Sequence, residues 1–191
     1  MFEFVKKYED CGLVLPVRKT SDSAGYDLAA AEDTIIPPME DLMVSMLHKK
    51  NNEPISYFTL EEMATLTKEC KAKPTLVPTG LKCALPENTY LELSVRSSTP
   101  LKYWLVLANS VGIIDRDYYN NSSNEGHIYL QMINLSPFPI KIQKGEFIGQ
   151  AIVKPYLTLE GDCAQGTRTG GFGSTSESTC STENALRCMI T

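Results

Sequence analysis

Short apolar segments separated by turn residues dominate the chain after Pro74. Proline and glycine turn signals lie between them, for example at Pro78-Thr79-Gly80, Ser136-Pro137 and Lys144-Gly145. Many short strands at such intervals are typical of an all-β domain, either a sandwich or a barrel-like jelly roll. The strands are expected at residues 75–77, 80–84, 90–95, 104–107, 128–134, 138–142 and 147–155.

The first part of the chain continues this pattern, with strands expected at 2–8, 26–30 and 34–36. Residues from about 39 to 74 then interrupt it as a partly helical insertion. Within the insertion, residues 41–47 could form a strand, whereas 59–73 are predicted to form a helix. Thr59 and Glu62 have the spacing of a capping box, and Pro74 ends the helix.

The length of 191 residues suits one β domain, expected over residues 1–175, that carries the insertion at about 39–74. From Gly161 onward the chain is rich in Gly, Ser and Thr and offers little apolar surface to bury. Residues 161–191 are therefore expected to form a flexible C-terminal tail.

The charge balance limits the classes of partner that the chain is expected to bind. A net charge of −5 and a pI near 5.1 argue against stable nucleic-acid binding. No apolar run reaches the roughly 18 residues of a membrane span, and the N-terminus lacks the order of a signal peptide, so a cytoplasmic protein is expected. The six cysteines show no C-x-x-C spacing and are expected to be free thiols, and zinc is not expected.

Five polar stretches at turns and strand ends could carry chemistry. In 107–119 an apolar run ends at Asp115, which could act as a general base or be a solvated turn residue. In 95–99 an arginine beside hydroxyls suits phosphate oxygens, although a polar turn is equally compatible. In 168–175 glycines let the backbone approach phosphates, and Phe172 could stack on a base; a linker is the alternative. The remaining two stretches, 24–28 and 144–150, are uninformative alone.

Taken together and in this order, the five stretches resemble the five motifs of the trimeric dUTP pyrophosphatases (deoxyuridine 5′-triphosphate nucleotidohydrolases). The resemblance covers roughly residues 12–38 and 75–175, about two thirds of the chain. It implies a jelly-roll homotrimer with active sites at subunit interfaces, each built from all three chains. It also implies a dUTP diphosphatase that forms dUMP and pyrophosphate, limits uracil in DNA and provides dUMP for thymidylate synthesis.

The resemblance further implies a role for each matching residue. Asp115 would be the general base that activates a water for in-line attack on the α-phosphorus. Tyr118 would pack on the deoxyribose and exclude a 2′-hydroxyl. Asn109 would read the uracil edge, together with backbone groups of the same hairpin that include Gly112 and Ile114.

The phosphates and metal would be bound elsewhere in the pattern. Asp27 would hold a water in the shell of a Mg²⁺ ion that the phosphates bind, which fits the reluctance of this ion to lose its water. Arg168 would reach the γ-phosphate, and Phe172 would cover the uracil as the tail closes. Further substrate contacts would come from Arg96, Ser97, Ser98, Gln150, Gly173, Ser174 and Thr175.

Three departures from the pattern leave questions open. Arg168 is one residue closer to Phe172 than is common in the family. Residues 120–125 form an extra loop after Tyr118, for which a surface excursion is the favoured interpretation. The insertion at 39–74 is either a decoration packed on the roll, which is slightly favoured, or a docking surface for a protein partner. Such additions are also compatible with an enzyme encoded by a phage or virus and acting in the host cell.

Two other functions are alternatives to dUTP hydrolysis. A dCTP deaminase of the same fold would use a glutamate as base, and no glutamate stands in a matching place. A regulatory binding protein could use the insertion, but binding would then supplement hydrolysis because the residues needed for catalysis are present.

Overall fold

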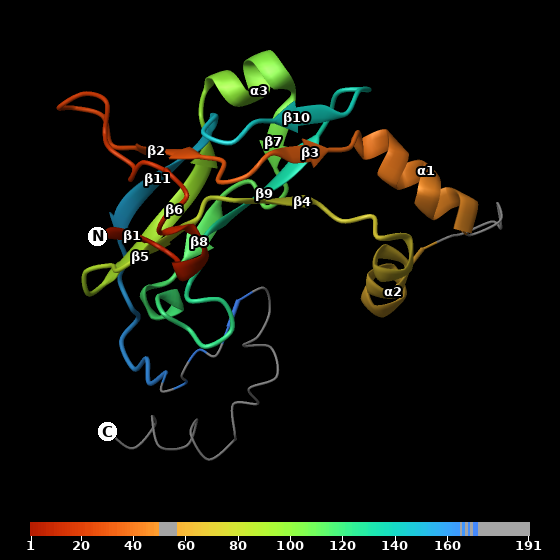
Figure 1. The fold of residues 1–191 in the computed structure, drawn as a ribbon. Helices are drawn as coiled ribbons and strands as arrows, with labels where there is room; N and C mark the ends of the chain where they lie inside the picture. Colours follow the sequence, from red (N-terminus) through yellow and green to blue (C-terminus); the bar gives the residue numbers. More distant parts are fainter. Residues whose placement is uncertain (50–56, 165, 167, 169, 172–191) are drawn as a thin grey trace.

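The computed structural model describes residues 1–49, 57–164, 166, 168, 170 and 171. In this part of the chain all strand pairs are antiparallel, and the larger sheets lie beside one another (Figure 1). A four-stranded sheet has the order β2 (Tyr26–Ala29), β11 (Phe147–Pro155), β6 (Thr89–Val95), β8 (Gly112–Ile114). A three-stranded sheet has the order β4 (Thr75–Pro78), β9 (Tyr129–Asn134), β7 (Leu105–Leu107). Two further pairs are β1 (Phe2–Phe4) with β5 (Leu81–Cys83), and β3 (Thr34–Ile36) with β10 (Ile140–Ile142).

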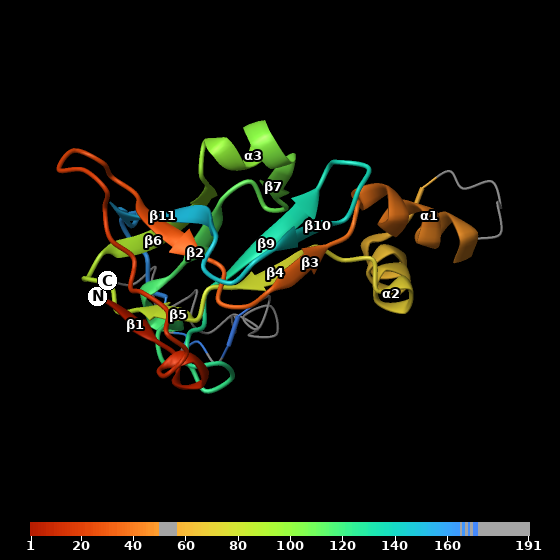
Figure 2. The same ribbon diagram turned by 45° about the horizontal axis from the view of Figure 1, so that its top comes forward.

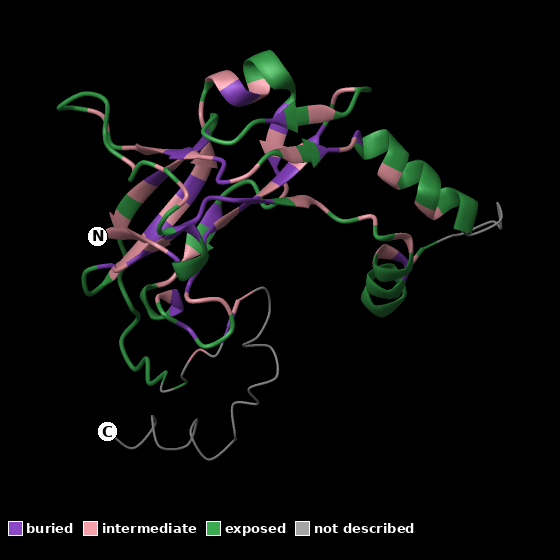
Figure 3. Cartoon of the chain, in the orientation of Figure 1, coloured by how far each residue is buried: buried purple, intermediate pink, exposed green. Residues whose placement is uncertain are grey.

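The core lies between these sheets and follows the two-residue period of the strands. In β9 every second residue is buried, namely Leu130, Met132 and Asn134, and in β6 the same holds for Leu91 and Leu93. These positions appear as the buried stripes along the strands in Figure 3. The all-β class and most of the expected strands are therefore confirmed, although the first strand ends at Phe4 and gives way to a short 3-10 turn.

The strand expected at 41–47 is wrong, because these residues belong to helix α1 (Met39–Lys49). One stripe of this helix carries Met43 and, one and four residues after it, Val44 and Leu47. Each of these side chains is more than a third exposed. The acidic first turn and basic last turn also suit the helix dipole.

The second helix of the insertion, α2 (Leu60–Cys70), confirms the predicted helix and its capping box at Thr59 and Glu62. The Thr59 hydroxyl accepts from the Glu62 backbone N–H at 3.2 Å, and the Glu62 carboxylate accepts from the Thr59 N–H at 2.9 Å. The helix ends at Lys71, which has a left-handed backbone (φ 53°), so it stops before Pro74 is reached.

The insertion does not pack on the sheets as expected, because α1 and α2 project together from one end of the molecule (Figures 1 and 2). They contact each other, for example through the Cys70 thiol and the Ser45 carbonyl at 3.7 Å. In the two helices only Leu66 is buried. No helix in the described ranges has the length and apolar character needed to cross a membrane.

The cysteines divide into two groups. Cys11, Cys70 and Cys83 are free thiols, as predicted. Cys163 is disulfide-bonded, so the prediction of a free thiol is wrong there. This cysteine lies in an exposed segment, 161–164, where no packing shields its sulfur from another thiol.

A buried histidine joins the N-terminal segment to the core. The ring of His127 lies between Tyr8 and Tyr129, with centroid distances of 5.3 and 4.1 Å. Its Nε2 accepts a hydrogen bond from the Gly80 backbone N–H at 3.0 Å, which requires the neutral imidazole. Burial lowers the pKa of His127 from its usual 6.5 to about 4, and the positive charge of Lys7 adds to this effect.

The lowered pKa of His127 predicts that the free energy of unfolding decreases as the pH falls below about 6.5. The unfolded chain then binds a proton that the folded chain does not bind until pH about 4, so protonation favours unfolding. Between pH 7 and pH 5 the loss attributable to His127 is about 2 kcal/mol. The hydrogen bond from Lys7 lowers the pKa of Glu32. The stability that Glu32 contributes is lost only as the pH falls below the pKa of 4.5 that this residue has in the unfolded chain.

Denaturant unfolding of the protein and of His127→Gln at several pH values tests this prediction. Glutamine can still accept from the Gly80 N–H but does not titrate, so the variant should lack most of the loss between pH 7 and pH 5. Equal losses in the two proteins would contradict the assignment.

Candidate active site

The connection from β7 to β8 holds the residues of the 107–119 stretch, but it is not the hairpin expected from the sequence, because β7 pairs with β9 and β8 pairs with β6. It turns at Ser110, which has a left-handed backbone (φ 60°), and Gly112 then pairs with Leu93 of β6. A Cβ at Gly112 would lie 3.1 Å from the Leu93 side chain, so the two strands approach as closely as a glycine allows. Pairing of Ile114 with Leu91 fixes the far end of β8, and Asp115 follows it directly.

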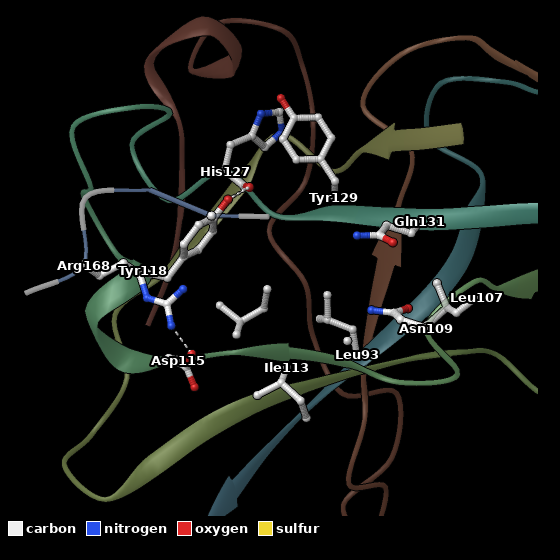
Figure 4. Close-up of a pocket in the computed structure, with 13 residues that line it drawn as sticks. Leu93, Leu107, Asn109, Ile113, Asp115, Tyr118, His127, Tyr129, Gln131 and Arg168 are labelled. Atoms are coloured by element: carbon white, nitrogen blue, oxygen red, sulfur yellow. Dashed lines mark hydrogen bonds and ion pairs between the residues drawn. The ribbon is translucent and has the colours of Figure 1, made fainter. Parts of the chain in front are cut away.

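A pocket of about 220 Å³ opens beside the connection from β7 to β8 (Figure 4). Asn109 and Gln131 lie on one side of it, and Tyr118 and Asp115 lie on the other. The pocket combines an apolar floor with a few polar groups, as small-molecule sites do. It is lined by Leu93, Leu107, Asn109, Gly112, Ile113, Ile114, Asp115, Tyr118, His127, Tyr129, Gln131, Arg168 and Gly171.

Six residues singled out from the sequence thus line one pocket, namely Asn109, Gly112, Ile114, Asp115, Tyr118 and Arg168. Sequence reasoning missed the part contributed by β9 and the residues before it. His127, Tyr129 and Gln131 alternate along the chain, and this period of two was the signal that they share one face of a strand.

The backbone positions Asp115, and its carboxylate plays no part in capping the helix that follows. Its extended conformation (φ −75°, ψ 157°) makes it the N-cap of the short 3-10 helix η2 (Arg116–Tyr118), but its side chain makes no cap hydrogen bond. The side chain is 49% exposed, so the carboxylate can reach a ligand in the pocket. In this arrangement the guanidinium of Arg168 binds it, and also binds Asp117 at 2.8 Å.

Tyr118 lies at the back of the pocket and is 6% exposed. Its hydroxyl donates to the His127 carbonyl at 3.1 Å. A Cβ at Gly171 would lie 2.7 Å from the Tyr118 ring, so the tail passes directly over that ring. The residues after Tyr118 are not the surface excursion expected, because Asn121 is buried and donates to the Tyr118 carbonyl at 2.8 Å.

A second polar cluster lies where β2, β6 and β11 meet. Asp27 stands opposite Gln150 in the β2–β11 pairing, and its carboxylate is 3.2 Å from Arg96 Nε. The Gln150 amide donates to the Val95 carbonyl at 3.3 Å. The structure thus brings together Asp27, Arg96 and Gln150, which the sequence had placed far apart.

The arginine–serine stretch leads into a helix that was not predicted, α3 (Ser98–Tyr103). Ser97 is its N-cap residue, and Thr99 is buried and donates from its hydroxyl to the Ile148 carbonyl at 2.9 Å. Ser97 and Ser98 therefore lie next to the cluster of Asp27 and Arg96.

Asp115, at the rim of the pocket, and Arg96, in the second cluster, lie toward opposite ends of β6. Leu91 pairs with Ile114, beside Asp115, whereas Arg96 lies five residues farther along the strand direction. At about 3.3 Å per residue the two sites are separated by at least roughly 16 Å. Arg96 and Asp115 of one chain do not meet in this arrangement, because Arg96 pairs with Asp27 and Asp115 pairs with Arg168.

The last motif lies mostly outside the described residues. Arg168, Gly170 and Gly171 are described, and Arg168 lies on Asp115 rather than near Arg96. The predicted contacts of Phe172, Gly173, Ser174 and Thr175 fall beyond the described part of the chain.

Comparisons with known proteins show the family to which the chain belongs. A deoxyuridine 5′-triphosphate nucleotidohydrolase of Lactococcus lactis is 40% identical over 176 residues, which are 91% of this chain and 95% of the relative. The crystal structure of a Streptococcus mutans dUTPase, 36% identical, has a TM-score of 0.62 and covers 83% of this chain and 97% of that chain.

A more distant structure shares the fold alone. It is a variant of the dUTPase of Staphylococcus aureus phage phi11, 15% identical with a TM-score of 0.54, and covers 88% of this chain and 96% of that chain. That structure was described as revealing the coordination of a structural Mg(II) ion. The family model for dUTPase matches residues 58–176, which is more than half of the chain. This chain therefore belongs to the dUTPase family.

Proposed function

We propose that this protein hydrolyses dUTP to dUMP and pyrophosphate, and so limits uracil in DNA while providing dUMP for thymidylate synthesis. The observation that carries the proposal is the position of Asp115, a half-exposed carboxylate at the rim of a small, mostly apolar pocket. In such a position a carboxylate can orient and deprotonate a water next to a bound ligand.

The uracil is expected to bind between Asn109 and the backbone of β8. The Asn109 amide and the backbone groups of Gly112 and Ile114 offer fixed donors and acceptors beside an apolar floor. Cytosine presents the opposite donor and acceptor at two ring positions, so it would leave buried polar groups unpaired. An unpaired buried group costs about 1–3 kcal/mol, which is enough for strong discrimination.

The deoxyribose is expected to pack on the Tyr118 ring. Because this ring is almost fully buried, it cannot move aside for a larger sugar. A 2′-hydroxyl would therefore meet the ring, and UTP would be rejected by steric exclusion.

In the chemical step, Asp115 would accept a proton from a water while the water oxygen attacks the α-phosphorus in line. The bond between the α-phosphorus and the bridging oxygen breaks, and pyrophosphate leaves. Arg168 would move from Asp115 to the γ-phosphate, which frees the base. Phe172 would cover the uracil, and Gly173, Ser174 and Thr175 would add phosphate contacts as the tail closes.

The phosphates would be bound by the second cluster, through Arg96, Ser97, Ser98 and Gln150. A Mg²⁺ ion held by the phosphates would add charge neutralisation there. Asp27 suits such an ion because its carboxylate could hold one water of the metal shell. No group of three or more potential side-chain ligands occurs in the described ranges, so the phosphates and waters would supply the other ligands.

We propose that the active site is completed by other copies of the chain, in a homotrimer. The separation of Arg96 and Asp115 along β6 supports this proposal. The phosphate-binding residues and the general base of one complete site would then come from different copies of the chain. Exposed apolar side chains such as Leu101, Trp104 and Val153 provide surface for subunit contacts.

The insertion is expected to act outside this chemistry, and any partner it has would be a protein. Neither α1 nor α2 contributes a residue to the pocket, and Met43, Leu47 and Leu60 are exposed on them. Replacing residues 41–73 by a short Gly/Ser linker should therefore leave kcat for dUTP within about twofold of the parent. A loss of turnover in a variant that still assembles would show that the insertion supports the site.

Parallel measurement of pyrophosphate release from dUTP, dCTP, dTTP and UTP with Mg²⁺ tests the proposed reaction. Selective release from dUTP is expected, since only this substrate satisfies both the base and the sugar contacts. Ammonia release from dCTP would instead support the deaminase alternative. No glutamate lines the pocket among the described residues, which disfavours that alternative.

Asp115→Asn tests the base. Asparagine keeps the shape of the side chain but cannot take the proton, so kcat should fall by about a hundredfold or more. The variant should still bind a non-hydrolysable dUTP analogue and keep its assembly state. Asp117→Asn is a matched control, since Asp117 also pairs with Arg168 but lines no part of the pocket. Undiminished turnover of Asp115→Asn would remove Asp115 from the mechanism.

A further inference from the structure

The loop of residues 119–126 contributes no residue to the pocket, yet it surrounds the pocket's tyrosine from behind. The side-chain amide of Asn124 donates to the Tyr118 hydroxyl at 2.7 Å. The same hydroxyl donates to the His127 carbonyl at 3.1 Å. The hydroxyl therefore has one donor and one acceptor as partners, and these fix the far end of the ring.

The near end of Tyr118 is held by the same loop. The side-chain amide of Asn121 donates to the Tyr118 carbonyl at 2.8 Å. Gly126 passes so close that a Cβ there would lie 2.6 Å from this carbonyl, and its left-handed backbone (φ 82°) suits glycine. Both the backbone and the ring of Tyr118 are thus positioned by residues 121–126.

Hydrogen bonds within the loop hold its shape, because its asparagine side chains bind each other and the backbone of the turn. Asn121 is 7% exposed, and its Oδ1 accepts from the Ser123 N–H, the Ser123 hydroxyl and the Asn124 N–H at 3.0, 2.7 and 3.2 Å. Asn124 Oδ1 accepts from the Asn121 amide at 2.9 Å and from the Gly126 N–H at 3.1 Å. These bonds leave the Asn124 amide hydrogen directed at Tyr118.

Contacts with the body of the protein hold the loop from outside. Lys82 Nζ donates to Asn120 Oδ1 at 2.8 Å, and the Glu125 carboxylate accepts from the Lys6 backbone N–H at 3.2 Å. The loop is therefore tied to β5 at one end and to the 3-10 turn Lys6–Tyr8, which follows β1, at the other.

We propose that Asn124 is a positioning residue that sets the sugar selectivity of the pocket by holding the Tyr118 ring. A ring without its hydroxyl contacts could tilt about its two side-chain torsions, and a shift of about 1 Å changes catalytic efficiency greatly. The tilt would make room for a 2′-hydroxyl and would also loosen the deoxyribose. The inference rests on the proposed role of Tyr118 as the surface on which the sugar packs.

The test compares kcat/KM for dUTP and for UTP in Asn124→Ala, Tyr118→Phe and the double variant. Asn124→Ala should lower the dUTP-to-UTP selectivity by about tenfold or more, mainly through faster UTP hydrolysis. Tyr118→Phe removes the hydroxyl that Asn124 binds, so it should have a similar effect. The double variant should be no less selective than Tyr118→Phe alone, because both changes remove one interaction.

Ser123→Ala is the matched control. It removes a hydrogen bond within the same loop, to Asn121, but does not touch Tyr118, so selectivity should stay at the parent value. Asn124→Ser provides a second variant in case the alanine variant does not fold. The serine stays polar inside the loop but is too short to reach the tyrosine hydroxyl, so selectivity should again fall.

The outcomes separate this inference from the proposed function. Parent-like selectivity in Asn124→Ala or in folded Asn124→Ser would overturn the inference while leaving dUTP hydrolysis intact. An equal loss in Ser123→Ala would also overturn it, because the effect would then reflect the loop as a whole. A parent enzyme that does not distinguish dUTP from UTP would overturn the role of Tyr118 and the inference with it.

Discussion

The antiparallel pairing of β6 with β8 is the constraint on which the site depends. It sets Gly112 against Leu93 and Ile114 against Leu91, which places Asp115 at one end of β6 and Arg96 at the other. Burial of Leu91 and Leu93 fixes this register, because a slip of one residue would turn every side chain to the opposite face. The same pairing thus builds the pocket and removes the second cluster from it.

The tyrosine that follows β8 depends on contacts from other segments of the chain. Tyr118 is held by the 119–126 loop, by the His127 carbonyl and by the passage of Gly171 over its ring. His127 in turn must stay neutral to accept from Gly80, and burial between two tyrosine rings keeps it so. The core that stabilises the fold and the wall of the pocket are therefore the same residues.

Much of the fold could be predicted from local patterns. The alternation of apolar residues predicted β9, and Thr59 with Glu62 predicted the start of α2, since both signals act within a few residues. Helix α1 could not be predicted because its short apolar stripe also fits a strand. The separation of Arg96 from Asp115 and the bond from Asn124 to Tyr118 depend on strand pairing and loop packing, which the order of residues does not specify.

Mixed oligomers of two inactive variants test the shared site most directly. Arg96→Ala and Asp115→Asn should each be nearly inactive alone, and should then be unfolded, mixed in equal amounts and refolded together. If each site takes Arg96 and Asp115 from different copies, about a quarter of the sites are intact, and about a quarter of the parent pyrophosphate release returns. Mixtures no more active than the separate variants would contradict the account, because they would place both residues of a site in one chain.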